Sequence, residues 1–479
     1  MAKIPFSSDM IPRGDDRITP YTTDVLYHGE PDWVYRARDF KDLQEILRYC
    51  DQEKIPVTVS GSRTALTGAG IAEEGILVAM EKKNRLLEIG LDPVTKVPSA
   101  TAEPGILLGE FQRQIREAGY FYPPDPTSRN DAQLGGTIGT NATGEDALLY
   151  GPTRKYVRRL KILKANGEEI ILERKQPYRG SVKNRAGYFL GGDLIDLFVG
   201  SEGTLGIVTE VTVDLLPAER PFFAGWAFFP DLHSGLEFVV AALNSSSIKP
   251  RALELIDNES LRIVATKERA PSACQTADCA ITFKQEYSDE QEMGHRMEGW
   301  LHLLEGILNK RNAAHLVNEI AIAMDEPAQQ NFRLLRHAIP ASANEEGRRY
   351  QVNGGGKIAT DWWVPVEKIQ EMMGLVEQES RESGIRYLAY AHIGDGHPHL
   401  NYITKNADEK RRANGLLIRQ CERAVKLGGG VAGEHGVGKL FRNLLPIQYR
   451  STVVQEMKKI KLSYDPHQIL GRGNLWSLD

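Results

Sequence analysis

The chain has 479 residues, of which 41% are hydrophobic and 26% are charged, and its formal net charge is -5. A chain of this length exceeds a single compact core and predicts two or three domains. The composition is ordinary for a globular enzyme. So small a net charge favours neither nucleic acid nor an anionic membrane surface as a partner.

Cysteine is scarce, and Cys50, Cys274, Cys279 and Cys421 form no Cys-x-x-Cys pair. Their spacing argues against an iron–sulfur cluster or a zinc ribbon and suits a reducing compartment. The first residues lack a basic segment followed by an apolar core, and no run approaches the roughly 20 apolar residues of a membrane span. We therefore expect a soluble, cytoplasmic protein, with peripheral membrane association as the alternative.

The first 217 residues alternate between predicted helices and strands. Apolar residues at helical spacing predict a helix over residues 36–53, and a β-branched run predicts a strand over 55–60. Two apolar strands near 206–217 close this part. Because two prolines within residues 217–221 interrupt regular structure, we place a domain boundary there.

The remainder predicts an α+β domain over residues 218–429 and a C-terminal segment over 430–479. Strand-like and helical patterns alternate through the first of these parts, as is typical of that class. The long helices of the two parts are predicted near residues 289–310, 365–383, 408–427 and 447–462.

Three glycine-rich stretches in the first 217 residues could each bind an anion. They cover residues 60–70, residues 124–128 leading into 135–144, and residues 199–207. Small residues let successive backbone N–H groups converge on a diphosphate, although a single loop rich in Gly and Ser is usually a simple turn. None has the Gly-x-Gly-x-x-Gly fingerprint after a strand or a Gly-Lys-Ser/Thr loop, which argues against a nicotinamide or nucleoside-triphosphate enzyme.

In order and spacing, these stretches resemble the FAD-binding domain of the vanillyl-alcohol oxidase and p-cresol methylhydroxylase flavoproteins. Residues 150–154 and 183–188 resemble further motifs of that family, so that the likeness covers residues 25–217. One departure is Ser62-Arg63, where the family has a glycine-rich entry. The FAD contacts that the resemblance implies are Ser60, Gly61, Ser62, Arg63, Thr64, Leu66, Pro124, Thr127, Ser128, Gly135, Gly136, Gly139, Thr140, Asn141, Gly144, Glu202, Gly203, Gly206 and Ile207.

The same resemblance implies an α+β fold in which a two-subdomain FAD-binding domain, residues 1–217, precedes a cap domain with an antiparallel sheet, residues 218–429. The segment 430–479 would complete the active site and return to the first domain. Some members of the superfamily attach FAD through histidine or cysteine. Because His28 and Cys50 lie outside the glycine-rich stretches, we expect non-covalent FAD.

Four histidines, His392, His397, His399 and His435, lie within 44 residues. Two β-type stretches flank a Gly- and Asp-rich turn of six residues, 393–398, and predict a hairpin. His392 ends one strand and His399 begins the next, so the hairpin would place these two imidazoles across from each other. The simpler alternative is a pair of hydrogen-bonded histidines in a hairpin.

A predicted helix follows this hairpin and stops at glycines 428–430, after which Glu434 and His435 occur side by side. Two histidines and one glutamate are a common ligand set for a catalytic divalent metal, with positions left open for substrate. The alternative is that Glu434 and His435 form a solvated pair in a loop.

Residues 392–401 and 434–438 resemble the C-terminal motifs of the FAD-linked D-2-hydroxy-acid dehydrogenases, a group with D-lactate, D-2-hydroxyglutarate and glycolate dehydrogenases. The resemblance implies a divalent metal, zinc first and Mn²⁺ or Fe²⁺ as alternatives. It implies the metal ligands His392, His399 and Glu434, the base His435, and the substrate contacts Asn401, Arg336 and Lys357. The alternative is that Arg336 and Lys357 are plain surface residues, as an arginine more often is.

Two positions depart from that pattern. His397 stands where the family commonly has asparagine, and Gly471-Arg-Gly473 replaces an Asn-Pro-Gly sequence. His397 could add a metal ligand or a proton relay, whereas the second change bears on FAD contacts. Trp362 and Trp363 either line a pocket for the substrate side chain or pack in the core.

The predicted reaction is oxidation of a small D-2-hydroxy acid to the 2-oxo acid, with hydride transfer to flavin N5 and His435 as base. Electrons would then pass to an electron-transferring flavoprotein, a quinone or a cytochrome. One alternative is a flavin transferase, because residues 435–439 resemble a segment of alkyl-dihydroxyacetone-phosphate synthase. Another is a non-catalytic flavin subunit of a respiratory complex. The oligomeric state stays open, with a homodimer as one alternative.

Overall fold

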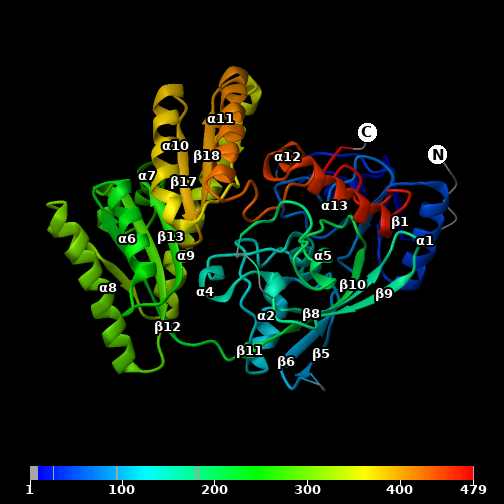
Figure 1. Ribbon diagram of the computed structural model, residues 1–479, viewed down its shortest axis with the longest axis horizontal. Helices are drawn as coiled ribbons and strands as arrows, with labels where there is room; N and C mark the ends of the chain where they lie inside the picture. Colours follow the sequence, from blue (N-terminus) through cyan, green and yellow to red (C-terminus); the bar gives the residue numbers. More distant parts are fainter. Residues whose placement is uncertain (1–8, 25, 93–94, 179, 181–182, 478–479) are drawn as a thin grey trace.

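The computed structural model describes residues 9–24, 26–92, 95–178, 180 and 183–477, which form two lobes (Figure 1). The N-terminal lobe begins with a four-stranded sheet of order β1-β2-β4-β3. Strands β2, β4 and β3 run parallel, while β1 is antiparallel to β2. These strands are β1 (Met10–Pro12), β2 (Trp33–Arg36), β3 (Val57–Ser60) and β4 (Ile76–Ala79).

Helix α1 (Phe40–Glu53) packs against this sheet and lies within the helix predicted for residues 36–53. Asp39 caps its first turn by accepting a hydrogen bond from Lys41 N at 2.9 Å. Leu43, Ile46, Leu47 and Cys50 fall on one face and are fully buried. The helical spacing read from the sequence therefore marks the face that packs on the sheet.

The second sheet of the N-terminal lobe is antiparallel, with the order β5-β6-β10-β8-β9. Its strands are β5 (Leu86–Leu91), β6 (Pro98–Ala102), β8 (Val157–Leu163), β9 (Glu169–Glu173) and β10 (Ile207–Asp214). Helices α2 (Leu108–Glu117), α3 (Leu134–Thr140), α4 (Ala147–Tyr150) and α5 (Ile195–Phe198) and the short pair β7 (Tyr120–Phe121) and β11 (Leu216–Pro217) belong to the same lobe.

The second lobe, here called the cap lobe, is built on a seven-stranded antiparallel sheet of order β15-β12-β14-β13-β17-β18-β16. This sheet confirms the expected antiparallel architecture and the α+β class. Its strands are β12 (Phe222–Phe229), β13 (Pro250–Asp257), β14 (Cys279–Glu286), β15 (Ala321–Ala323), β16 (Gly356–Ala359), β17 (Tyr387–His392) and β18 (His397–Thr404).

Helices cover both faces of the cap sheet. One hydrophobic cluster unites α6 (Leu232–Asn244), α8 (Glu290–Lys310), α10 (Ile369–Ser383) and α11 (Ala407–Lys426) with one face. Two other clusters join α7 (Asn258–Ala265) and α9 (Glu326–Tyr350) to the opposite face. The helix α9, which carries Arg336, was not expected from the sequence, and Pro340 lies inside it.

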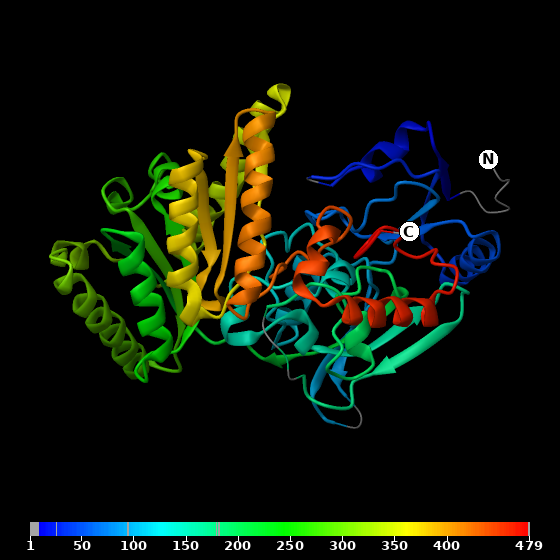
Figure 2. The same ribbon diagram turned by 45° about the horizontal axis from the view of Figure 1, so that its top comes forward.

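The C-terminal segment crosses back to the N-terminal lobe. Helices α12 (Leu445–Gln448) and α13 (Ser451–Tyr464) lie over that lobe in both views (Figures 1 and 2). Beyond α13, Leu470 bridges to Val57 of β3, and Gly471 N donates to Val57 O at 2.9 Å. One chain therefore supplies both lobes and closes the first of them with its last residues.

Short 3-10 helices connect these elements. No helix in the described part of the chain is both long and apolar enough to cross a membrane. The 3-10 helices are η1 (Asp16–Tyr21), η2 (Thr153–Lys155), η3 (Ser272–Gln275), η4 (Ala314–Glu319), η5 (Gln351–Asn353), η6 (Val366–Lys368), η7 (Ile393–Asp395) and η8 (Arg442–Leu444).

Candidate active site

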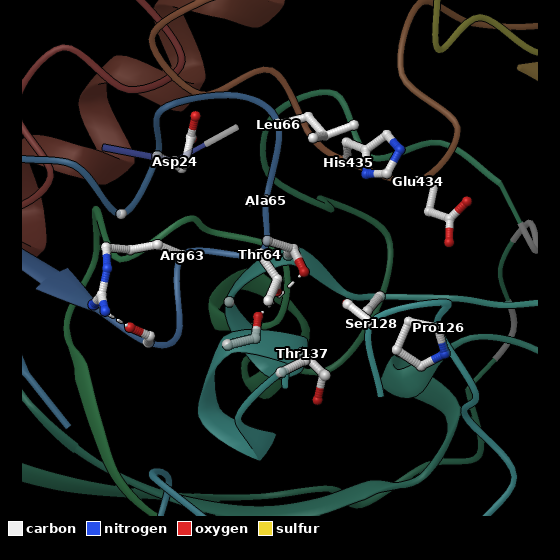
Figure 3. A pocket seen from close by; sticks show the side chains of 18 of the residues that line it. Asp24, Arg63, Thr64, Ala65, Leu66, Pro126, Ser128, Thr137, Glu434 and His435 are labelled. Carbon is white, nitrogen blue, oxygen red and sulfur yellow. Dashed lines mark hydrogen bonds between the residues drawn. The ribbon is translucent and has the colours of Figure 1, made fainter. Parts of the chain in front are cut away.

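A cavity of about 380 Å³ lies between the two lobes (Figure 3). The glycine-rich stretches of the N-terminal lobe form one wall, and α9, β16, β18 and the loop after α11 form the other. Of the residues expected to contact FAD, those that line the cavity are Gly61, Ser62, Arg63, Thr64, Leu66, Thr127, Ser128, Gly135, Gly136, Gly139, Thr140, Glu202, Gly203 and Gly206.

The residues that line the cavity do not include the other five expected FAD contacts, Ser60, Pro124, Asn141, Gly144 and Ile207. The side chain of Asn141 accepts a hydrogen bond from Arg154 N at 2.9 Å, and Ile207 is buried in the core. At Gly144 a Cβ atom would lie 1.9 Å from Asp125 O, so only glycine fits. These residues shape the wall and do not face the cavity.

The N-terminal wall has the features of a flavin cradle. At Gly136 and Gly139 an added Cβ would meet nothing within 4 Å, so the backbone is open to the cavity. Gln133, which the sequence did not single out, also lines the cavity, and its buried Oε1 has no hydrogen-bond partner among the described residues. A ligand with hydrogen-bond donors would satisfy that atom, because buried polar groups are normally paired.

The histidine hairpin forms as strands β17 and β18, joined by residues 393–396. The register corrects the expected pairing: His397 lies directly opposite His392, and His399 lies opposite Tyr390. The connection is shorter than six residues because His397 and Pro398 already belong to β18. His392 and His399 are thus diagonal neighbours, with ring centroids 5.1 Å apart.

Three of the predicted residues converge at one point. Glu434 Oε2 lies 3.3 Å from Nε2 of His392 and 3.3 Å from Nε2 of His399. His392 and Glu434 are buried, and His399, Glu434 and His435 line the cavity. Figure 3 shows Glu434 beside His435. The hairpin strands β17 and β18 supply the two histidines, and the loop after α11 supplies the glutamate.

A carboxylate that the sequence did not indicate lies behind the histidines. Glu254 of β13 is buried, and its Oε1 lies 2.6 Å from Nδ1 of His392. Its Oε2 accepts two hydrogen bonds from Arg336, from Nε at 2.9 Å and from Nη2 at 2.6 Å. Glu254 therefore connects a predicted metal ligand to a predicted substrate contact.

The electrostatics of the group favour a bound cation. Burial opposes charge on His392, but the carboxylates of Glu254 and Glu434 raise the pKa of His392 to about 9. Burial and the neighbouring His397 hold the pKa of His399 well below its usual range. Burial opposes ionisation of Glu434, yet His392 holds the pKa of Glu434 well below its usual range. Two carboxylates thus converge on His392 and stabilise positive charge there, which a bound cation would supply in place of a proton.

The predicted substrate residues lie along the cap wall. Arg336, Lys357 and Asn401 all line the cavity, and Asn401 Nδ2 donates to His399 O at 3.0 Å. Burial lowers the pKa of Lys357 to about 8. Pro340 and Asn344 follow Arg336 at four-residue intervals on α9 and also line the cavity. That helical spacing is the signal by which Asn344 could have been found.

Trp362 and Trp363 do not line the cavity. Trp362 is fully buried in the core, and its Nε1 donates to Gln420 at 3.3 Å. Of the two alternatives for this pair, core packing holds for Trp362. The four cysteines are buried as free thiols.

Solved structures share this two-lobed architecture. Over 98% of this chain and 94% of the other, the fold matches p-cresol methylhydroxylase with substrate bound, at a TM-score of 0.69 and 16% identity. Alkyldihydroxyacetonephosphate synthase matches over 97% of this chain and 82% of its own, at a TM-score of 0.69 and 15% identity. At such identities the likeness concerns the fold alone, which is that of the p-cresol methylhydroxylase type.

Sequence comparison defines the family. Residues 31–173 match the FAD binding domain, and residues 223–475 match the C-terminal domain of the FAD linked oxidases. The glycolate oxidase subunit GlcD of Bacillus subtilis (strain 168) is 30% identical over 96% of this chain and 92% of that protein. D-2-hydroxyglutarate dehydrogenase of Stutzerimonas stutzeri (strain A1501) is 27% identical over 96% and 95%. The chain belongs to the FAD-linked oxidases, and it is an FAD-binding oxidoreductase.

Proposed function

We propose that this chain oxidises a small D-2-hydroxy acid to the 2-oxo acid with the help of a divalent metal ion. The observation that carries the proposal is the convergence of His392, His399 and Glu434 beside His435, on the cap wall of a cavity whose other wall fits a flavin. The names of the relatives support the substrate class, because glycolate, D-lactate and D-2-hydroxyglutarate are all 2-hydroxy acids.

Two of the three ligand pairs have the spacing expected at a tetrahedral metal site, and all three ligand atoms lie within 4.8 Å of one another. Two ligand atoms that each lie about 2.0–2.1 Å from a zinc ion at the tetrahedral angle are about 3.3 Å apart. Glu434 Oε2 lies 3.3 Å from Nε2 of both histidines. Glu254, which accepts from Nδ1 of His392, fixes the tautomer that leaves Nε2 for an ion. Zn²⁺ is the first candidate, with Mn²⁺ and Fe²⁺ as alternatives.

The remaining side chains bind and orient the substrate. When bound, a flavin supplies a hydride acceptor and a divalent ion supplies positive charge at the substrate's oxygens. His435 accepts the hydroxyl proton, a role that suits an imidazole near neutral pH. Arg336 and Lys357 attract the substrate's carboxylate, and Asn401 offers an amide beside His399.

The proposal includes a route for the electrons. The glycine-rich wall would hold FAD non-covalently, and a bound FAD would supply a path for two electrons to an electron-transferring flavoprotein, a quinone or a cytochrome. Cys50 is buried in the core and absent from the cavity wall, which supports non-covalent attachment. We propose a cytoplasmic location, which is compatible with peripheral membrane association. A homodimer is a compatible oligomeric state.

The test compares Glu434→Gln and His399→Ala with the wild type and with His467→Ala, a matched control at a half-exposed histidine paired with Asp51. We expect all four proteins to hold FAD. The first two variants should lose the metal and most flavin reduction by D-lactate, D-2-hydroxyglutarate or glycolate, whereas the control should keep both. Metal-free Glu434→Gln that reduces flavin at the wild-type rate would refute the metal assignment.

A further inference from the structure

Asp361 binds three consecutive backbone amides of the loop that carries Glu434 and His435. Its carboxylate Oδ2 accepts from Glu434 N at 3.2 Å and from His435 N at 3.0 Å. Its main-chain oxygen accepts from Gly433 N at 2.6 Å. In a loop without such a partner, these N–H groups would bond to water. Asp361, a single residue of the cap lobe, therefore fixes the backbone that carries the side chains of Glu434 and His435.

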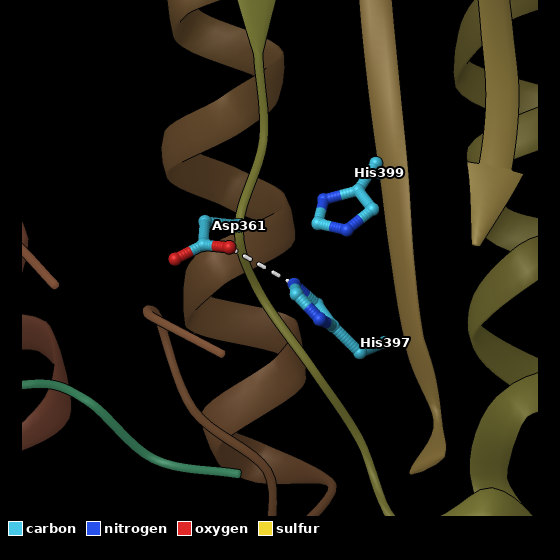
Figure 4. A group of neighbouring side chains, drawn as sticks. All are labelled: Asp361, His397 and His399. Atoms are coloured by element: carbon cyan, nitrogen blue, oxygen red, sulfur yellow. Dashed lines mark hydrogen bonds and ion pairs between the residues drawn. The ribbon is translucent and has the colours of Figure 1, made fainter. Parts of the chain in front are cut away.

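The other carboxylate oxygen of Asp361 is held by His397, with Oδ1 lying 2.9 Å from Nε2 (Figure 4). Because an ionised carboxylate only accepts hydrogen bonds, Nε2 of His397 carries the proton. The His397 ring is fully buried and packs against Gly433, where a Cβ atom would lie 2.7 Å from the ring. The histidine thus fixes the orientation of the Asp361 carboxylate and the approach of the loop.

The same residues could be read as a second cation site, because ligand atoms of Asp361, His397 and His399 lie within 4.8 Å of one another. Two observations favour hydrogen bonding over coordination. Oδ2 of Asp361 already accepts from two backbone amides, and Oδ1 lies at hydrogen-bond distance from Nε2 of His397. His399 also belongs to the group around Glu434, so two ions would compete for one imidazole.

The opposite end of the loop is held by the N-terminal lobe. Glu202 accepts from Val437 N at 2.9 Å with Oε1 and from Gly438 N at 2.7 Å with Oε2. Gly436 is required beside it, because a Cβ atom there would lie 2.3 Å from Glu202 Oε1. Backbone hydrogen bonds therefore hold the two ends of the loop, one end to Asp361 of the cap lobe and the other to Glu202 of the N-terminal lobe.

We propose that Asp361 and His397 are a positioning pair that sets the backbone of Glu434 and His435 without binding the metal. This inference rests on the proposed function for the roles of those two side chains. It gives His397, which departs from the family pattern, a specific task. Hydrogen-bonding partners behind metal ligands typically contribute about 10–100-fold in metal affinity or activity.

The test uses Asp361→Ala and His397→Leu, with His397→Gln as the conservative variant, because its amide N–H can replace the imidazole N–H. The control is Asp257→Ala, which removes a buried carboxylate at the end of β13. Asp257 caps α7 by accepting from Ser260 N at 2.9 Å. Amide hydrogen exchange of the peptide covering residues 431–441 is measured by mass spectrometry. Zn²⁺ content and affinity are measured by elemental analysis and chelator competition.

We expect faster exchange at residues 433–435 and about 10–100-fold weaker Zn²⁺ binding in Asp361→Ala and His397→Leu, with FAD content unchanged. His397→Gln and the control should resemble the wild type. Unchanged exchange in folded Asp361→Ala, or two Zn²⁺ ions per wild-type chain of which one depends on Asp361, would overturn the inference. A wild type that binds no Zn²⁺ would refute the proposed metal, whereas hydrogen exchange would still test the pair.

Discussion

Glu254 Oε1 lies 2.6 Å from Nδ1 of His392, in the buried sheet behind the cavity. Since the carboxylate accepts, it fixes the proton on Nδ1 and turns Nε2 toward Glu434. Glu254→Gln keeps the shape and removes the charge, so we expect about 10–100-fold weaker Zn²⁺ affinity in chelator competition. Glu259→Gln, a neighbour on the more exposed α7, is the control. Wild-type affinity in Glu254→Gln would contradict this role.

The base is tested by single-turnover flavin reduction. His435 lines the cavity beside Glu434 and is not one of the three converging ligand groups. His435→Gln should slow anaerobic flavin reduction by about 10²–10⁴-fold, the usual contribution of a general base, while metal and FAD content stay at wild-type levels. An unchanged rate constant in stopped-flow absorbance would remove His435 from the mechanism.

The pH dependence of kcat/KM should follow the protonation of Lys357. Burial lowers the pKa of Lys357 to about 8, and no described residue forms an ion pair with it. The ammonium is present below that pKa and is lost above it, so kcat/KM should fall as pH rises through about 8. Lys357→Arg should keep kcat/KM high at alkaline pH, and Lys357→Met should be low throughout. The same alkaline decrease in Lys357→Arg would exclude Lys357 as its cause.

Stability should depend on a buried ion cluster between the lobes. Arg251 of β13 contacts Asp146 at 2.5 Å, Glu219 at 2.6 Å and Glu286 at 3.3 Å. Arg251→Met removes the guanidinium that these three carboxylates share and leaves Asp146 with Lys284 alone. Losing one partner of a buried ion pair costs about 3–5 kcal/mol. Arg423→Met, which breaks the exposed pair with Glu371, should cost less than about 1 kcal/mol. Equal shifts in the urea midpoints of the two FAD-loaded variants would contradict this difference.

Most of the elements that were predicted correctly follow from patterns among residues close together in the sequence. Helix α1, helix α11 and the β17–β18 hairpin follow from periodicity and turn residues a few positions apart. Glu254 and Asp361 could not be found in this way, because sheet register and loop packing bring them to residues 138 and 36 positions away. Helix α9 was not predicted, since Pro340 and many polar residues obscure its apolar face. That His397, and not His399, lies directly opposite His392 likewise depends on the strand register.

Anaerobic flavin reduction in the wild-type protein tests the metal-assisted oxidation of a D-2-hydroxy acid most directly. The substrates are glycolate and the D- and L-enantiomers of lactate and 2-hydroxyglutarate, supplied before chelation, after chelation and after Zn²⁺ is restored. We predict that a D-2-hydroxy acid bleaches the flavin, that chelation slows this by about 100-fold or more because the ion contributes several kcal/mol, and that Zn²⁺ restores it. Undiminished reduction in the metal-free protein, or no bleaching by any of these acids, would contradict the account.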